Sequence, residues 1–212
     1  MLFGSKGLLG ASIAAQGAHE FIAPLHDELD LLNHAAVRAW LLTTSPDVVI
    51  NCTAYSQVDT AEDEPGTHFV FRASWLYGAT GKNFFSAVRN WLQEERHLRI
   101  VSDQISTPND VQNLARVFNE WLTLAKNSPA SSRAFFNQHQ GLYHLSAPRL
   151  MSRYAFAQRV ALDLKVNGIA VKATMEAVPA SSFSMKAKRP AYSGLISKKF
   201  EQQFDIEFEM QK

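Results

Sequence analysis

Three glycines near the N-terminus give the first chemical signal in the sequence. Gly4, Gly7 and Gly10 are spaced as G-x-x-G-x-x-G, between a short apolar segment and an apolar run. Glycine at such positions permits a tight turn and lets the backbone approach a pyrophosphate, which the N–H groups of the following helix then bind. A loop that needs only backbone freedom could show the same spacing. A dinucleotide-binding loop is the favoured interpretation, and a purely structural turn is the alternative.

A protein that binds a nicotinamide dinucleotide can reduce a carbonyl group, which requires a proton donor. The sequence lacks the residue pattern that would supply one. A tyrosine can supply that proton when a lysine four residues later lowers the pKa of its hydroxyl. Lys82 follows Tyr77 by five residues, which places the two on different faces of a helix. No lysine stands four residues after any tyrosine of the chain: Tyr55, Tyr77, Tyr143, Tyr154 or Tyr192. We therefore assign no catalytic residue.

Composition excludes several classes of protein. The chain has 212 residues and a net charge of +1, with basic and acidic residues interspersed. This pattern argues against a nucleic-acid groove or a polybasic membrane surface, and no apolar run is long enough to cross a bilayer. Cys52 is the single cysteine, so neither an intrachain disulfide nor a cysteine zinc site is expected. No metal ligand is assigned, and the expected location is cytoplasmic.

The elements that must position these residues alternate between strand and helix. Residues 127–140 are polar and predict a loop. Apolar patterning predicts strands at 1–3, 20–25, 48–53, 69–77, 98–101 and 142–145, and helices from the glycine loop to about 16 and at 35–43, 83–93, 110–126 and 152–164. Alternation of this kind is typical of an α/β doubly wound fold.

Two neighbouring segments resemble a known family. Residues 48–65, VVINCTAYSQVDTAEDEP, and residues 71–84, FRASWLYGATGKNF, are similar to the dTDP-4-dehydrorhamnose reductases of the extended short-chain dehydrogenase/reductase superfamily. In that family a long stretch between them holds a helix, a strand and the helix with the Tyr-x-x-x-Lys pair. That stretch is absent here, which indicates an internal deletion between Pro65 and Phe71. Weaker matches cover most of residues 2–208.

The resemblance implies a fold and a division of the chain. The fold would be a Rossmann-like doubly wound parallel sheet, lacking one strand and the active-site helix, with a small C-terminal substrate-binding subdomain. Residues 1–101 would form a truncated NAD(P)-binding domain, interleaved with a sugar-nucleotide-binding region at 102–212. The strand at 69–77 would pair with 48–53 in the vacated place, or the sheet would stay open there. Apolar surface exposed by the deletion would favour a homodimer.

The resemblance also implies a cofactor site. Leu25 stands where an acidic residue would hold the ribose of NAD, and Lys6 and His26 nearby would tolerate a 2′-phosphate. NADPH is therefore favoured, NADH remains open, and so does a magnesium ion. Asp30 could instead be a solvated acid before a helix. The cofactor-binding residues would be Gly4, Gly7, Leu8, Leu9, Gly10, Asp30, Leu31, Ala54, Tyr55 and Ser56.

The substrate residues implied by the resemblance are Trp75, Asp103, Gln104 and Arg189. Trp75 would pack against the deoxysugar and Arg189 would pair with the diphosphate. The alternatives are core packing for Trp75 and a solvated charge for Arg189. Arg153 occupies a position where the family often has tryptophan.

The implied reaction is the NAD(P)H-dependent reduction of dTDP-6-deoxy-L-lyxo-4-hexulose to dTDP-L-rhamnose, a precursor of cell-surface polysaccharide. Because the tyrosine–lysine pair is missing, we expect weak turnover. The alternatives are a non-catalytic subunit that binds a dinucleotide or a nucleotide sugar, possibly in regulation, and a truncated product without function.

Overall fold

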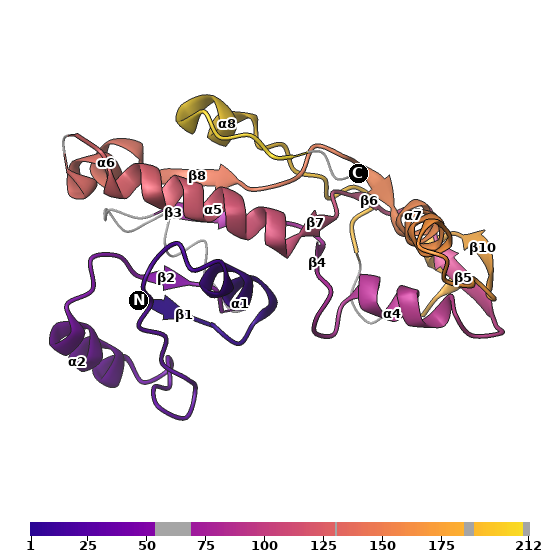
Figure 1. Ribbon diagram of the computed structural model, residues 1–212, viewed down its shortest axis with the longest axis horizontal. Helices are drawn as coiled ribbons and strands as arrows, with labels where there is room; N and C mark the ends of the chain where they lie inside the picture. The colour runs from indigo at the N-terminus through magenta and orange to yellow at the C-terminus, as the bar shows by residue number, and fades with distance from the viewer. Residues whose placement is uncertain (54–68, 130, 185–188, 210–212) are drawn as a thin grey trace. The chain divides into compact units, whose positions relative to one another are not determined.

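The computed structural model describes residues 1–53, 69–129, 131–184 and 189–209. These residues form two compact units, each built from two stretches of chain: Met1–Val70 with Ala115–Gly141, and Phe71–Leu114 with Leu142–Lys212. The division at residue 101 concerns binding functions and stays a prediction. Helices and strands are mixed in both units and several strand pairs are parallel, so the predicted α/β class is confirmed (Figure 1).

A short parallel strand pair forms the centre of the first unit. Strand β1 (Leu2–Phe3) pairs with β2 (Ile50–Asn51), with Leu2 opposite Ile50. Leu2 is fully buried, as expected for a central parallel strand. Helix α1 (Leu8–Ala15) follows the glycine loop, as the sequence predicts.

Helix α2 (His34–Thr44) begins where the sequence predicts. The Asn33 side chain accepts a hydrogen bond from the Ala36 N–H at 3.1 Å and so caps the helix. Trp40 and its apolar neighbours on one face pack against the buried residues Met1, Phe3 and Leu29. The helix is held by this one face, and its other face is exposed.

The predicted strand at residues 20–25 is wrong. This segment forms no strand, and its described link to β1 is a single hydrogen bond from the Leu2 N–H to the Ile22 carbonyl, 2.9 Å long. Pro24 has no N–H to donate to a ladder, which explains why the pairing ends there.

The predicted loop at residues 127–140 is also wrong. Helix α6 (Ser132–His139) lies within it, and the Ser131 side chain accepts from the Ala134 N–H to cap its start. Phe135 is buried, with its ring 6.4 Å from that of Trp121 on helix α5 (Val111–Lys126). The polar composition hid a short amphipathic helix whose aromatic face packs on α5.

The expected strand at 69–77 divides into β3 (Phe69–Arg72) and β4 (Leu76–Tyr77). Between them Trp75 takes a φ of +38°, which no strand accommodates. The predicted pairing with residues 48–53 is wrong for the strands described: β3 pairs with β8 (Gly141–His144), and β2 with β1. The Phe71 ring, 6.2 Å from that of Tyr143, fixes β3 beside β8.

The second unit is built on a helix-covered strand pair. Helices α4 (Phe84–Trp91) and α7 (Arg153–Val166) share an apolar core with β5, which includes Val88, Phe156 and Leu164. Its strand pairs are β4 with β7 (Asn109–Asp110) and β5 (His97–Val101) with β10 (Thr174–Val178), both parallel, and β6 (Ile105–Ser106) with β9 (Met151–Ser152), antiparallel. The turn η1 (Ala180–Ser182) and helix α8 (Lys198–Phe204) follow. None of the described helices has the length and apolar character that a bilayer crossing needs.

Close backbone packing explains two of the three loop glycines. Gly4 has a φ of +75°, and a Cβ there would lie 2.8 Å from the Cys52 carbonyl carbon. A Cβ on Gly10 would lie 2.9 Å from the Gly4 carbonyl carbon and would clash with its oxygen. The loop therefore closes against the end of β2, and α1 packs against the loop, only because both positions lack a side chain.

We predict that Gly4→Ala lowers the free energy of unfolding by about 2–4 kcal/mol. Left-handed backbone costs roughly 1–2 kcal/mol and overpacking about 1–3 kcal/mol. Gly17→Ala is the matched control, because Gly17 has a similar φ of +66° but nothing within 4 Å of a Cβ. Urea unfolding should separate the two variants by about 1–3 kcal/mol; equal losses would contradict the packing against Cys52.

Candidate functional site

The glycine loop offers backbone donors at the end of a parallel strand. The Gly7 N–H donates to the Gly4 carbonyl at 2.9 Å and closes the turn that leads into α1. No side chain caps the start of this helix, so N–H groups of its first turn remain available for a ligand. Leu8 and Leu9 are half-buried beside them. This arrangement fits a phosphate group, which helix N-termini favour.

The remaining predicted cofactor residues have mixed surroundings. Asp30 is exposed and accepts a hydrogen bond from the Leu32 N–H at 3.0 Å, which forms a local turn. Leu31 packs against the cluster of Met1, Phe3 and Leu29. The cofactor roles of Asp30 and Leu31 stay predictions. Ala54, Tyr55 and Ser56 lie outside the described residues.

Cys52 lies at the junction of the loop and β2. It is half-buried, and burial raises the pKa of its thiol to about 11. The thiol therefore stays protonated at neutral pH and is a poor nucleophile. It acts as a packing residue at the back of the glycine loop.

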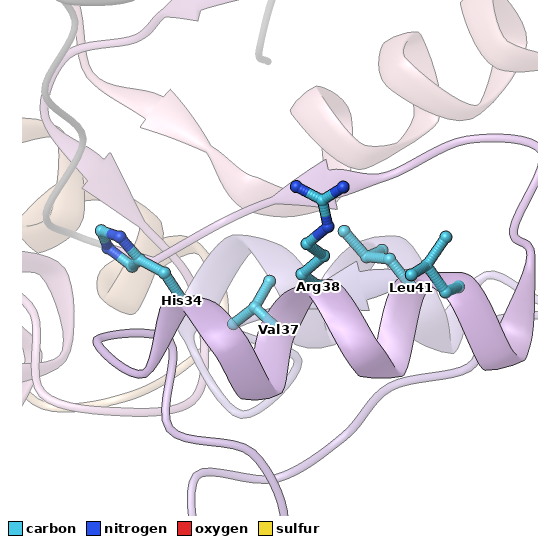
Figure 2. Close-up of a pocket in the computed structure, with 5 residues that line it drawn as sticks. His34, Val37, Arg38 and Leu41 are labelled. Atoms are coloured by element: carbon cyan, nitrogen blue, oxygen red, sulfur yellow. The ribbon is translucent and has the colours of Figure 1, made fainter.

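A hollow of about 410 Å³ lies on α2, and no predicted site residue is among those that line it. Its lining comes from this one helix, and His34 and Arg38 project from the same side of it (Figure 2). The lining residues are His34, Val37, Arg38, Leu41 and Leu42. No carboxylate or phenol is among them, and a single helix forms the hollow, so we regard it as a surface feature and not as an active site.

Trp75 is held in its unusual conformation by hydrogen bonds. Its carbonyl accepts from the Asn109 N–H at 3.0 Å. The preceding residue, Ser74, bonds through its hydroxyl to the Thr107 hydroxyl at 2.7 Å and to the Thr107 carbonyl at 3.0 Å. Trp75 is half-buried, so one part of its ring remains accessible.

Asn109 is the centre of this network and is 1% exposed. Its side-chain amide donates to the carbonyls of Ser74 and Thr107, the latter at 2.8 Å. Its carbonyl oxygen accepts from the Ala147 N–H at 2.7 Å. One side chain thus ties together three segments that lie far apart in the sequence.

Arg153 is a site residue that the sequence analysis did not assign. Its guanidinium carbon lies 4.6 Å from the ring centre of Trp75 and 4.9 Å from that of Phe84. Its Nε is buried and has no hydrogen-bond partner. Burial, and secondarily the charge of Arg189, lower the pKa of the Arg153 guanidinium. The signal in the sequence was the departure from the family's tryptophan.

The other predicted substrate residues differ in their surroundings and exposure. The Asp103 carboxylate accepts from the Ala180 N–H at 2.8 Å and so anchors η1. Gln104 is buried and Arg189 is exposed. Trp75 contacts Arg153 and the charge of Arg189 acts on it, whereas Asp103 anchors η1. The substrate roles of all four stay predictions.

A substitute for the missing proton donor is not evident at Tyr143. The Lys199 ammonium lies 4.3 Å from the centre of the Tyr143 ring and donates to the Leu142 carbonyl at 2.9 Å. The ammonium contacts the ring face, and burial raises the pKa of the Tyr143 phenol. Efficient donation needs the pKa lowered, so this tyrosine and lysine do not form a proton-transfer couple.

Side chains that could hold a metal ion would add a further kind of chemistry to these sites. In the part of the chain that the structure describes, no three His, Cys, Asp or Glu side chains gather to hold a metal ion. The candidate chemistry therefore consists of phosphate recognition at the glycine loop and of aromatic and cationic contacts around Trp75.

Comparison with known proteins finds several that are similar to this chain. A family model described as the RmlD substrate binding domain matches residues 1–69 and 65–212. The two matches meet at the junction between Pro65 and Phe71, although the deletion itself stays a prediction. The dTDP-4-dehydrorhamnose reductase of Salmonella typhimurium is 30% identical over 164 residues, which are 77% of this chain and 52% of that protein. The reductase of Escherichia coli K12 is 29% identical over 170 residues, 79% of this chain and 54% of that protein.

This chain therefore spans about half the length of these relatives. Among solved structures, the dTDP-4-dehydrorhamnose reductase of Clostridium acetobutylicum superposes with a TM-score of 0.73 at 24% identity, over 95% of this chain and 91% of that chain. The reductase of Bacillus anthracis in complex with NADP gives 0.74 at 20% identity, with the same coverage. These likenesses show the Rossmann-like α/β fold.

We predict that Asn109→Ala lowers the free energy of unfolding by about 2–4 kcal/mol, because it leaves the buried Ala147 N–H without its partner and removes the amide bonds to the Ser74 and Thr107 carbonyls. Asn90→Ala on the exposed side of α4 is the control and should change stability by less than about 0.5 kcal/mol. Urea unfolding monitored by tryptophan fluorescence measures both. Equal effects would contradict a central role for Asn109.

The Tyr143 phenol should titrate later in the folded protein than in the unfolded chain. Its folded pKa is raised, so its contribution to stability is complete below the unfolded value of about 10 and is lost as pH rises through the folded value. Absorbance at the tyrosinate band, with Tyr143→Phe subtracted and urea-unfolded protein as the reference, measures this. If Tyr143 ionised at a pH below the pKa of an unfolded tyrosine, its exclusion as a proton donor would be contradicted.

Proposed function

The chain belongs to the RmlD substrate binding domain family, and from this membership we propose that it binds a nicotinamide dinucleotide and a nucleotide-linked 4-keto sugar but reduces the sugar only weakly. The observation that carries the proposal is the glycine loop, which closes on the end of β2 and leaves the start of α1 uncapped. This geometry supports a dinucleotide phosphate at that position.

The cofactor we propose is NADPH in preference to NADH. Leu25 offers no carboxylate for the ribose hydroxyls. His26, the next residue, is exposed, and so is Lys6 in the glycine loop. A cation suits the 2′-phosphate that distinguishes NADPH. The presence of NADP in the Bacillus anthracis relative supports the same choice.

The sugar we propose is dTDP-6-deoxy-L-lyxo-4-hexulose, which would be converted to dTDP-L-rhamnose. The names of the relatives support this substrate, and the half-buried Trp75 supplies an aromatic face of the kind that packs on the apolar side of a sugar. Ala54, Tyr55 and Ser56 are proposed to border the nicotinamide, and Asp103 and Gln104 the sugar nucleotide.

A second candidate function is binding without catalysis, as a regulatory subunit. The contact between Lys199 and the face of the Tyr143 ring favours it, because that pair has the wrong geometry and the wrong pKa shift for proton donation. A homodimer stays a prediction.

Fluorescence titration with NADPH and NADH tests cofactor binding. We expect saturable binding, tighter for NADPH. Lys6→Ala should weaken NADPH by up to about fivefold and leave NADH unchanged, because an exposed ion pair contributes roughly 0.2–1 kcal/mol. Lys126→Ala, another exposed lysine of the first unit, is the matched control. Absence of binding at millimolar concentrations of both cofactors would end the proposal for the glycine loop.

Oxidation of NADPH in the presence of the dTDP-linked 4-keto sugar tests the catalytic part. We expect a rate about 10²–10⁴-fold below that of a reductase with the tyrosine–lysine pair, which is the usual contribution of general acid catalysis. The Salmonella typhimurium reductase, assayed in parallel, gives the reference. Comparable turnover in the two proteins would refute weak reduction.

A further inference from the structure

We propose that Arg153, beside the rings of Trp75 and Phe84, binds an oxyanion, namely the phosphate group of the nucleotide-linked ligand that the resemblance already assigns to Arg189. The inference rests on the proposed function for the identity of the ligand, but the site itself is argued from the side chains. It assigns a specificity-determining role to Arg153, at a position where the family often has tryptophan.

The backbone brings the two arginines to the same end of strand β6. Ile105 pairs with Ser152 in antiparallel register and forms a parallel bridge with Tyr192. Its N–H donates to the Ala191 carbonyl at 2.7 Å, and its carbonyl accepts from the Ser193 N–H at 2.9 Å. The residue that follows Ser152 and the residues that precede Tyr192 therefore lie toward the Gln104 end of β6. Arg153 and Arg189 are among them.

Aromatic rings position the Arg153 guanidinium. It lies 4.6 Å from the Trp75 ring centre and 4.9 Å from that of Phe84. A planar guanidinium stacks well on such rings and retains N–H groups in its own plane for a bidentate contact. The stack therefore presents a pre-oriented donor group, which loses less conformational entropy on binding than a free side chain would.

The charge of the site is uncompensated. Within the described residues no carboxylate lies within 4 Å of either guanidinium, and the Arg153 Nε is buried without a partner. Asp103, the acid closest along β6, uses a carboxylate oxygen to accept from the Ala180 N–H. A buried charge that lacks a partner is costly, and a second positive charge nearby adds to that cost. A bound anion would satisfy both arginines.

The start of α7 adds a favourable field. Arg153 is its first residue, and the Ser152 side chain accepts from the Ala155 N–H at 3.0 Å. The helix has 14 residues, and no acidic side chain occupies its first turn. The positive end of the helix dipole therefore lies at Arg153, where it favours a bound anion.

Binding of inorganic pyrophosphate and of dTDP to the full chain, measured by calorimetry, tests the site. We expect both to bind at one site per chain when saturating NADPH occupies the glycine loop. Arg153→Gln and Arg189→Gln should each weaken both ligands by at least about tenfold, the usual effect of losing a charge-assisted hydrogen bond. Arg153→Lys should bind with intermediate affinity, because it keeps the charge and loses the planar fork. Arg89→Gln, an exposed arginine on α4, is the matched control and should bind as the unaltered protein does.

The outcomes separate the site from the proposed function. If dTDP binds equally well to the unaltered chain and to Arg189→Gln, an exposed position whose change should not affect folding, the oxyanion site is wrong while nucleotide binding survives. If pyrophosphate binds in an Arg153-dependent way but dTDP binds no better, the site is supported as a free-phosphate site and the nucleotide ligand is not. Failure of pyrophosphate to bind the unaltered chain, against sodium chloride of equal ionic strength, overturns the proposal.

Discussion

A buried polar network around Asn109 is the constraint on which the second unit depends. Asn109 bonds to Ser74, Thr107 and Ala147, and the Ser146 hydroxyl joins the network at Thr107 with a 2.6 Å bond. The network joins three segments of chain, around residues 74, 107–109 and 146–147, so it and not a continuous sheet fixes their mutual positions. In a low-dielectric interior such a network stabilises the fold only when every member is satisfied. This makes it specific, since few side chains other than an amide could donate and accept here.

The network has a consequence for the candidate site. Trp75 adopts a φ of +38°, a conformation that its own sequence would not favour, because the Asn109 N–H holds its carbonyl. The turn ends β3 and directs the Trp75 ring toward Arg153. In the first unit, the candidate site is shaped by a different interaction. There the absence of side chains at Gly4 and Gly10 lets the loop close against β2. Hydrogen bonds thus shape the candidate site around Trp75, whereas close backbone contact shapes the candidate site at the glycine loop.

Local sequence signals predicted the parts of the fold that are locally determined. Asn33 and Asn83 cap α2 and α4 through bonds within three residues, and both helices were foreseen. The failures have non-local causes. Helix α6 depends on the packing of Phe135 against Trp121, and the break in the 69–77 strand depends on Asn109, 34 residues beyond Trp75. In the site, resemblance identified Trp75 and Arg189 as candidates. It marked Arg153 only as a departure from the family's tryptophan, because the significance of Arg153 comes from the two rings it contacts.

The surroundings of Tyr143 illustrate why ligand binding can be retained where proton transfer is not. Binding sites for phosphates need donors and positive charge, which backbone N–H groups, helix ends and arginines supply in many arrangements. A phenol that donates a proton needs a cation near its oxygen, because only there does the charge stabilise the phenolate. Lys199 instead lies over the Tyr143 ring, and burial destabilises the phenolate further. A tyrosine and a lysine in contact are therefore insufficient for catalysis, and the pair at Tyr143 does not replace the Tyr-x-x-x-Lys spacing that the sequence lacks.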